Sequence, residues 1–405
     1  MAFDPVRCRA EFPVFQAYPD LAYLDSAATA QKPSCVLDAW RDATVLRSAN
    51  VHRGMYPLAE AATEAYEAAR AGIAGFLGAP THGIVMTKSA TEAINLVAQS
   101  WGSRHCCDGD VIAVTTLEHH SNMIPWFQLA ERSGARVRMV AIGEDGAVDL
   151  EDFRMLLEGG RVRLLAVTAR SNVLGSRPPL EAMIAMAHAA GAVVMVDAAQ
   201  AVAHERFDVA ALGCDFLTFS GHKLYGPSGI GVLYGKPELL SAMPPFLGGG
   251  MMIQEVTDDG YTAADVPARF EAGTPPLAEA EALHAALRWY AALDANALHA
   301  HEATLLARAR ELLLATPGVR VLGPADSSAV ASCLSFVVDD VHAHDVAALL
   351  GERGICVRAG HHCAQPLHRH LGIAASTRVS VAAYTTPDDI ERLGPALRDV
   401  ITLLR

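Results

Sequence analysis

The sequence has no long apolar run and no basic tract, and each absence excludes a class of protein. No stretch reaches the roughly 18 uninterrupted apolar residues of a membrane span, and the first residues, MAFDPVRCRAEF, lack the apolar core of a signal peptide. The 32 lysines and arginines stand against 45 acidic residues, a net charge of −13, and no basic run is long enough to follow a phosphate backbone. We therefore expect neither a membrane nor a nucleic acid as a partner.

Paired cysteine motifs are also missing. The eight cysteines form no C-x-x-C pair, and a bridge between adjacent Cys106 and Cys107 would be strained. Free thiols are typical of a reducing compartment, so we expect a cytoplasmic protein.

What is present indicates a large folded protein. A chain of 405 residues that is 51% hydrophobic exceeds what one core usually serves, which predicts two domains. Between about residues 60 and 235, short apolar runs alternate with amphipathic stretches, the βαβ rhythm of a parallel α/β sheet. The predicted buried strands are Val111–Thr115, Leu164–Thr168, Val193–Val196 and Phe216–Phe219, and the predicted helices are Pro57–Leu77, Glu92–Trp101 and Leu180–Ala190.

The rest of the chain predicts a smaller α+β domain. A Gly- and Pro-rich stretch at about 240–276 favours a loop and hairpin, and one long helical stretch from Leu277 to Thr316 follows. Beyond it we predict strands at Val319–Leu322, Ala331–Val338 and Cys356–Arg358, a helix at His344–Arg353 and a closing helix from Pro387.

Two charged residues follow neighbouring predicted strands. Asp197 stands at the end of the strand Val193–Val196, and Lys223 lies in the turn SGHKLYGP after the next strand. Carboxyl ends of parallel strands are where open α/β sheets bind ligands, and a lysine desolvated there can condense with a carbonyl. The alternative is a structural ion pair between Asp197 and Lys223.

An anion site is predicted beside them. In TKSATEAINLVA, Ser89, Ala90 and Thr91 open a helix whose free amides suit an anion, although taken alone this is an ordinary N-cap. Ser220 and His222 flank Lys223 and can bond phosphate oxygens. A Schiff-base lysine, an aspartate for a pyridinium nitrogen and an anion cradle together indicate pyridoxal 5'-phosphate.

Three further polar residues fit that cofactor. His119, in TTLEHHSN, could stack on its ring, and Asn172 and Gln200 could bond its phenolic oxygen. Each of them is otherwise an ordinary polar loop residue.

The segment VRAGHHCAQPLHRHLG contains the cysteine that is least easily explained as a small apolar residue of the core. Cys363 follows two histidines and precedes a proline, and nearby imidazoles and Arg358 favour its nucleophilic thiolate. His361, His362, His368 and His370 make a zinc site the alternative, but no matching ligand pair occurs elsewhere in the chain, and we predict no metal.

These motifs resemble the group II cysteine desulfurases, a family of pyridoxal-phosphate fold type I, also called class V aminotransferases, with related sulfinate desulfinases and selenocysteine lyases. The resemblance runs nearly end to end and rests on YLDSAATAQKP, NVHRG, EHHSNMIPW, SNVLG, DAAQ, SGHKLYGPSGIG, FLGGG, RFEAGTP and RAGHHCAQP. It implies a large domain with a mostly parallel seven-stranded sheet between helices (residues 21–290), a smaller α+β C-terminal domain with the nucleophile (291–405), and an N-terminal segment (1–20) packing on the smaller domain.

The resemblance also implies residue roles. Lys223 is the Schiff-base lysine, Asp197 the partner of the pyridine nitrogen, His119 the stacking imidazole with His120 as the substitute, and Cys363 the persulfide-forming nucleophile. Phosphate contacts come from Thr91, Ser220 and His222, and from Thr274 of a second subunit. Arg358 grips the substrate carboxylate, Arg378 and Asn172 support it, and His52 and Arg53 come from the partner subunit.

The implied reaction removes sulfur from L-cysteine, with L-selenocysteine as a further substrate, and gives L-alanine and a Cys363 persulfide. A homodimer and a sulfur-acceptor protein of the SufE or SufU type are the implied partners, in iron–sulfur cluster or other sulfur biosynthesis. The alternatives are an aminotransferase or kynureninase-like β-lyase on the same scaffold, which would need no thiol, and an inactive partner-binding homologue. Lys88, Arg170 and Met251 depart from the family pattern, and we expect these departures in dimer-facing and entrance regions.

Overall fold

A computed structural model describes residues 3–143, 145–326 and 330–405, and its centre is a seven-stranded sheet. The strand order is β2 (Ile84–Thr87), β8 (Gly231–Gly235), β7 (Phe216–Ser220), β6 (Val193–Asp197), β5 (Val162–Thr168), β3 (Val111–Thr115) and β4 (Arg136–Val140). Strand β8 is antiparallel to both of its neighbours, and the other paired strands of this sheet are parallel. The predicted mostly parallel sheet is confirmed.

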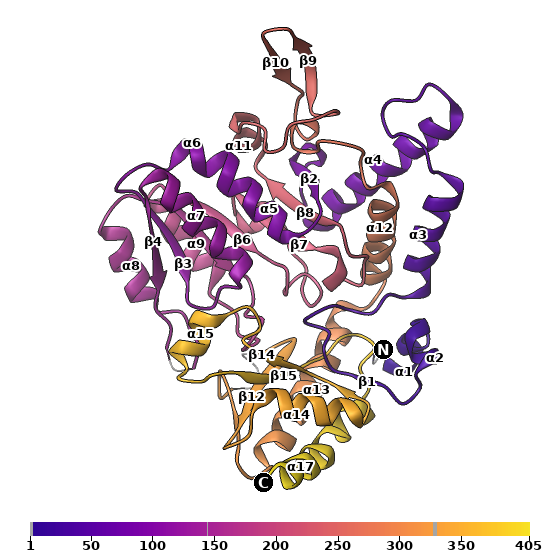
Figure 1. Cartoon of the computed structure of the whole chain (residues 1–405), viewed down its shortest axis with the longest axis vertical. Helices are drawn as coiled ribbons and strands as arrows, with labels where there is room; N and C mark the ends of the chain where they lie inside the picture. Colours follow the sequence, from indigo (N-terminus) through magenta and orange to yellow (C-terminus); the bar gives the residue numbers. More distant parts are fainter. Residues whose placement is uncertain (1–2, 144, 327–329) are drawn as a thin grey trace.

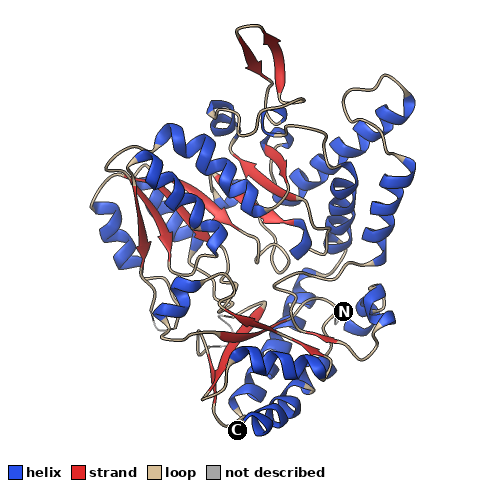
Figure 2. Ribbon diagram, viewed as in Figure 1, coloured by secondary structure: helices blue, strands red, loops and turns tan. Residues whose placement is uncertain are grey.

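Helices cover both faces of this sheet, as Figures 1 and 2 show. Alternate residues of β5 face opposite cores: Leu165 and Val167 belong to the cluster that includes side chains of α4, α9 and α12, whereas Leu164 and Ala166 belong to that of α5 and α7. Burial on both faces explains why the strands are apolar without alternation. The helices of this part are α3 (Ser34–Leu46), α4 (Pro57–Leu77), α5 (Ala90–Val97), α6 (Ser103–His105), α7 (Ile124–Ser133), α8 (Leu150–Glu158), α9 (Leu180–Ala189), α10 (Val209–Leu212), α11 (Pro237–Ala242) and α12 (Leu277–Ala291).

A second, antiparallel sheet lies below the first in Figure 1. Its order is β11 (Val319–Val321), β12 (Cys333–Val338), β15 (Ser376–Ser380) and β14 (Arg358–Gly360), and β1 (Ala22–Tyr23) pairs separately with β13 (Ile355–Cys356). Its apolar side chains form a core with those of α13 (Ala295–Leu314), α14 (Ala343–Glu352), α16 (Pro387–Glu391) and α17 (Leu393–Leu404). The remaining α-helices and strands are α1 (Pro5–Arg9), α2 (Pro13–Ala17), α15 (Gln365–His370) and the projecting hairpin of β9 (Ile253–Thr257) and β10 (Gly260–Ala263).

Three predicted elements are each divided in two. The predicted strand Cys356–Arg358 is β13 and β14, which pair with different strands, and the predicted closing helix from Pro387 is α16 and α17. The single helical stretch Leu277–Thr316 is two helices, α12 and α13, because Asp294 starts a new helix by accepting hydrogen bonds from the backbone N–H groups of Asn296 and Ala297, each at 3.1 Å. The limits of the N-terminal segment (1–20) and of the two domains (21–290 and 291–405) stay predictions. No helix in the described ranges is long and apolar enough to cross a membrane.

Candidate active site

A cavity opens where the carboxyl ends of the large sheet face the small sheet. Strands β5, β6 and β7 contribute their last residues, Thr168, Asp197 and Ser220, and the small sheet contributes Arg358 from β14 and Arg378 from β15. This is the end of an open α/β sheet at which ligands bind.

Most of the predicted site residues line this one cavity. They are Ser89, Ala90, Thr91, His119, Asn172, Asp197, Gln200, Ser220, His222, Lys223, Arg358 and Arg378. The predicted nucleophile Cys363 is half-buried and follows His362, which lines the cavity. Three others lie elsewhere in this chain, as expected of residues predicted to serve a second subunit: Thr274 lines a separate pocket beside Lys88, His52 pairs with Glu67 at 3.1 Å, and Arg53 donates a hydrogen bond to the sulfur of Met251 at 3.0 Å.

Asp197 and Lys223 do not form the structural ion pair that was the alternative interpretation. Among the described residues no ion pair joins them, and Asp197 instead accepts a hydrogen bond at Oδ1 from the N–H of Ala199 at 2.9 Å. Burial is the main cause that lowers the pKa of the Lys223 amine to about 8; Asp197 and Cys363 act against this shift, whereas Arg378 and Arg358 add to it. Lys223 is therefore poised to be an uncharged nucleophile near neutral pH.

The ring of His119 is held as a neutral imidazole. Burial, with Lys223 as the next cause, lowers its pKa to about 3. Its Nδ1 accepts a hydrogen bond from the N–H of Ser121 at 3.0 Å, which leaves the proton on Nε2. His120 does not line the cavity: its Nε2 accepts from the N–H of Gln365 at 3.1 Å.

The N-terminus of α5 forms one end of the cavity. Ser89 is the N-cap and accepts from the N–H of Glu92 at 3.3 Å, while the N–H of Ala90 donates to Ser220 Oγ at 2.9 Å. A side chain at Gly231 of β8 would lie 2.5 Å from the backbone of Ser89, so only glycine lets the helix tip rest against the sheet. Free amides of a helix start beside serine and threonine hydroxyls suit a phosphate.

Cys363 stands on a tight turn. His362 and Cys363 both have left-handed backbone angles, φ 50° and 56°, and the N–H of Ala364 donates to the carbonyl of His361 at 2.8 Å. This is the pattern of a type I′ turn, which normally holds Asn or Gly, so the conformation is strained here.

Hydrogen bonds from the segments that follow β3 and β5 of the large sheet hold that turn. The N–H of His120 donates to the carbonyl of Cys363 at 2.7 Å, and Asn172 Nδ2 donates to the carbonyl of His362 at 2.6 Å. The ring of His362 lies against Ser376 of β15, with Nε2 3.1 Å from Oγ. Cys363 thus lies on a strained turn that is held by contacts from both sides of the cavity.

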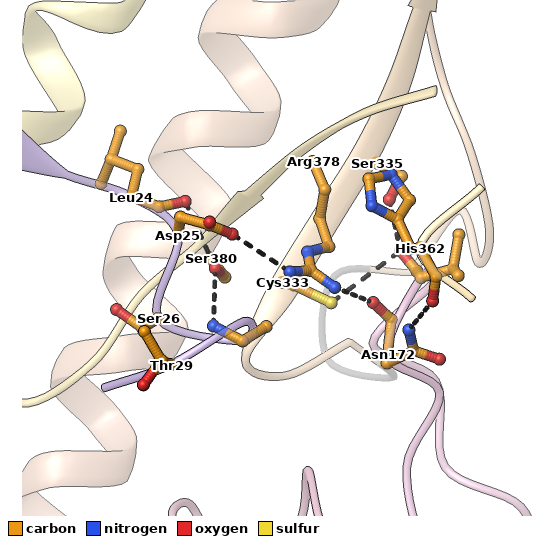
Figure 3. A network of polar contacts seen from close by, with 12 residues as sticks. Leu24, Asp25, Ser26, Thr29, Asn172, Cys333, Ser335, His362, Arg378 and Ser380 are labelled. Carbon is orange, nitrogen blue, oxygen red and sulfur yellow. Dashed lines mark hydrogen bonds and ion pairs between the residues drawn. The ribbon is translucent and has the colours of Figure 1, made fainter. Parts of the chain in front are cut away.

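The two arginines from the small sheet differ in their contacts. Arg378 is 1% exposed and is bonded to Asp25 and to the backbone of Asn172, as Figure 3 shows. Arg358 pairs with Arg378 in the β14–β15 register, lines the cavity and forms no ion pair in the described part of the chain. An unpaired guanidinium in a cavity suits a carboxylate ligand.

The structure also places residues that the sequence did not single out. Ala27, Ala28, Ser121, Thr168 and Ala199 line the cavity, and only their proximity to the quoted motifs could have indicated it. Within residues 3–143, 145–326 and 330–405, no group of three or more His, Cys, Asp and Glu side chains is arranged to hold a metal ion.

One expectation about the residues that depart from the family pattern is wrong. Arg170 is fully buried beyond the end of β5 and pairs with Glu205 at 2.9 Å, so it does not lie at an entrance or a dimer-facing surface.

Comparisons with known proteins agree with this geometry. The family model of the class-V aminotransferases matches residues 22–393. The chain belongs to the class-V aminotransferase family. A probable cysteine desulfurase 2 of Mycobacterium leprae is 46% identical over 95% of this chain and 94% of its own length. A cysteine desulfurase of Dickeya dadantii is 47% identical over 98% and 97%.

Two solved structures resemble the whole chain. The Escherichia coli cysteine desulfurase CsdA, in its S-sulfonic acid form, has a TM-score of 0.93 at 43% identity and covers all of both chains. The apo cysteine desulfurase of Thermococcus onnurineus NA1 has a TM-score of 0.95 at 36% identity, covering 100% of this chain and 99% of the other. The predictions of pyridoxal-phosphate fold type I, of a pyridoxal-phosphate-dependent enzyme and of a cysteine desulfurase are confirmed.

The cavity residues fit that cofactor. Lys223 offers an amine without an ion-pair partner in the described residues, Asp197 offers a buried carboxylate for a ring nitrogen, and His119 offers a neutral ring to stack. The α5 tip with Ser89, Thr91 and Ser220 offers hydroxyls and amides for the phosphate.

Proposed function

We propose that this chain removes sulfur from L-cysteine to give L-alanine and a persulfide on Cys363. The observation that supports it most is the placement of Lys223 and Asp197 on the large sheet opposite Arg358 and the Cys363 turn of the small sheet. When bound, pyridoxal 5'-phosphate supplies an electron sink for charge that develops on the substrate's α-carbon.

Lys223 is proposed to attach the cofactor and to move the α-proton. Its lowered pKa leaves a useful fraction of neutral amine at pH 7, and only the neutral amine accepts a proton. Asp197 would keep a proton on the ring nitrogen, and His119 would stack on the ring without adding charge, because its imidazole is neutral.

Arg358 is proposed to bind the substrate carboxylate through two parallel hydrogen bonds, with Arg378 and Asn172 in support. This orientation points the substrate's sulfur toward the turn that bears Cys363. The Cys363 thiolate attacks that sulfur, a sulfur–sulfur bond forms, and the carbon–sulfur bond breaks. The electron pair returns to the carbon skeleton, which takes up a proton and leaves as L-alanine.

The sulfur must then leave Cys363. We propose an acceptor protein of the SufE or SufU type, with iron–sulfur cluster assembly as the destination and L-selenocysteine as a further substrate. A homodimer is supported by the exposed apolar side chains Trp40, Val45 and Leu46 on α3 and Met55 just before α4. It is also supported by the lack of Thr274, His52 and Arg53 from this chain's own cavity. The cytoplasmic location stays a prediction.

A spectrum and a product assay test the proposal together. Protein mixed with pyridoxal 5'-phosphate should turn yellow, and with L-cysteine and a thiol reductant it should release L-alanine and sulfide in equal amounts. Lys223→Ala should abolish the colour, whereas Lys88→Ala, at an exposed lysine, should not. A wild type that stays colourless overturns the proposal.

Two cysteine variants separate the alternatives. Cys363→Ala should keep the colour and stop sulfide release, while Cys356→Ala, at another half-buried thiol, should behave as wild type. Undiminished sulfide release by Cys363→Ala would contradict the role of Cys363, and transamination of cysteine without sulfide release would favour the aminotransferase alternative.

A further inference from the structure

Asp25 is joined to the Cys363 turn by a chain of hydrogen bonds, shown in Figure 3. Asp25 Oδ1 accepts from Arg378 Nη2 at 3.1 Å, and Arg378 Nη1 donates to the backbone carbonyl of Asn172 at 2.8 Å. Asn172 Nδ2 then donates to the carbonyl of His362 at 2.6 Å. The connection thus runs from the segment after β1, through β15 and the loop after β5, to the turn.

The middle of this connection borders the proposed substrate site. Arg378 is almost fully buried, lines the cavity, and its Nε has no hydrogen-bond partner among the described atoms. Arg358 lies opposite it across the β14–β15 pair. A carboxylate bound by Arg358 can take up the unpartnered Nε–H of Arg378, because the remaining contacts of Arg378 direct its other nitrogens toward Asp25 and Asn172.

Asp25 is the carboxylate that pairs with this arginine. Arg378 has no other ion pair in the described residues, and its neighbour in the cavity, Arg358, is also cationic. Without the Asp25 charge, Arg378 would be free to turn toward a bound carboxylate and release the Asn172 carbonyl. Loss of the Asp25 charge would therefore disturb the Cys363 turn more than it would weaken the affinity for substrate.

The backbone of Asp25 is fixed independently of its side chain. Asp25 forms a bridge with Ser380 of β15, the N–H of Ser380 donates to Leu24 at 2.8 Å, and the N–H of Ala27 donates to Ser380 Oγ at 2.9 Å. A substitution that removes only the charge should leave this segment in place.

We propose that Asp25 is a positioning residue: by pairing with Arg378 it fixes Asn172, and through Asn172 it fixes the strained turn that carries Cys363. Binding of a carboxylate and placement of the Cys363 sulfur are thereby coupled. The proposal deepens the proposed desulfurase function and rests on it.

The test compares Asp25→Asn with Ser26→Ala. Ser26 is the next residue, is buried, and bonds Tyr384 instead of Arg378, with 2.9 Å between the hydroxyls. Asp25→Asn should lower kcat for alanine formation roughly tenfold, as expected for a lost charged hydrogen bond, while KM for cysteine stays within about threefold. Asp25→Glu should recover part of that loss, and Ser26→Ala should stay within about twofold of wild type.

A second measurement does not depend on turnover. Hydrogen exchange of the peptide containing residues 361–366 should be faster in Asp25→Asn and in Asn172→Ala than in wild type, with or without cofactor, and unchanged in Ser26→Ala. The double variant should be no faster than the faster single variant, because both changes break one connection. If Asp25→Asn does not fold, Asp25→Glu and Asn172→Ala carry the same comparison.

Three results would overturn the proposal: unchanged kcat and exchange in Asp25→Asn, a raised KM with unchanged kcat, or equal effects in Ser26→Ala. Failure of the proposed function itself gives a different result, since wild type would then form no alanine while the exchange difference among the variants could still be read.

Discussion

The N–H of Ser121 donates a hydrogen bond to Nδ1 of His119 over 3.0 Å and so decides which nitrogen of that ring carries the proton. The same contact starts the short helix His120–Asn122, which turns the chain toward the Cys363 loop. One hydrogen bond therefore sets both the ring chemistry and the path of the backbone.

A first prediction separates these two effects. In His119→Asn, the amide oxygen can still accept from Ser121, so the fold should persist while the ring is lost. Affinity for pyridoxal 5'-phosphate should fall roughly tenfold, the size of an aromatic stacking contribution, in a spectroscopic titration. Unchanged affinity would mean that His119 does not stack on the cofactor.

The second prediction concerns the pH dependence of cofactor capture. Only neutral Lys223 can condense with an aldehyde, and its pKa is lowered from 10.5 to about 8 by burial. The rate of colour formation by the apo protein should therefore rise tenfold per pH unit below 8 and level off above it. Stopped-flow absorbance between pH 6 and 10 measures the midpoint.

A charge variant checks the cause of that midpoint. Asp197 favours the protonated lysine, so Asp197→Asn should move the midpoint lower. A midpoint near 10.5 in the wild type would show that Lys223 is not desolvated in the apo protein.

The third prediction uses a buried carboxyl behind the cavity. Glu118 accepts hydrogen bonds from the Thr115 hydroxyl at 2.6 Å, the N–H of Thr168 at 3.0 Å and the Asn122 amide at 2.6 Å. Full burial nevertheless raises its pKa from 4.5 to about 8. A raised acid pKa means that the folded state holds a proton that the unfolded state has lost, so this group stabilises least at high pH.

The measurement is unfolding by urea at pH 5 and pH 8.5 for wild type and Glu118→Gln. Wild type should lose stability relative to the variant, by about 4 kcal/mol, as the pH rises through this window. The glutamine amide destabilises the variant by the same amount at every pH. Only the change with pH in the difference between the two unfolding free energies is therefore diagnostic. A constant difference would contradict a raised pKa.

A fourth prediction tests strain at the turn. Because Cys363 has φ 56°, a residue without Cβ should be more stable there. The free energy of unfolding should be about 1 kcal/mol larger for Cys363→Gly than for Cys363→Ala, because a residue with a Cβ atom loses about that much in the left-handed conformation. Equal stabilities would mean that the turn is not strained, and neither variant should release sulfide.

Much of the large sheet could be predicted from the sequence because its strands are buried on both faces. The run Val111–Thr115 and the helix Pro57–Leu77 have the predicted bounds, and Asp197 and Lys223 follow strand ends, where the sheet topology brings polar side chains together. The apolar pattern and the order of the strands were therefore enough to predict the part of the cavity that the large sheet forms.

The small-sheet side of the site was harder to predict. Strand β15, STRVS, has no apolar run, because its buried side chains are held by hydrogen bonds of Ser376, Arg378 and Ser380 instead of by hydrophobic packing. Arg170 meets Glu205, 35 residues away, and no local pattern indicates that pairing. The roles of Thr274, His52 and Arg53 stay predictions, since they concern a second copy of the chain.

The link between β14 and α15 has one further consequence. Only the residues His361, His362, Cys363 and Ala364 separate Gly360 from Gln365, and such a span reaches at most about 3.5 Å per residue. Because this link is short and is anchored at both ends and along its middle, it cannot carry Cys363 far from the cavity. An acceptor for the sulfur that Cys363 is proposed to carry would therefore have to reach the mouth of the cavity.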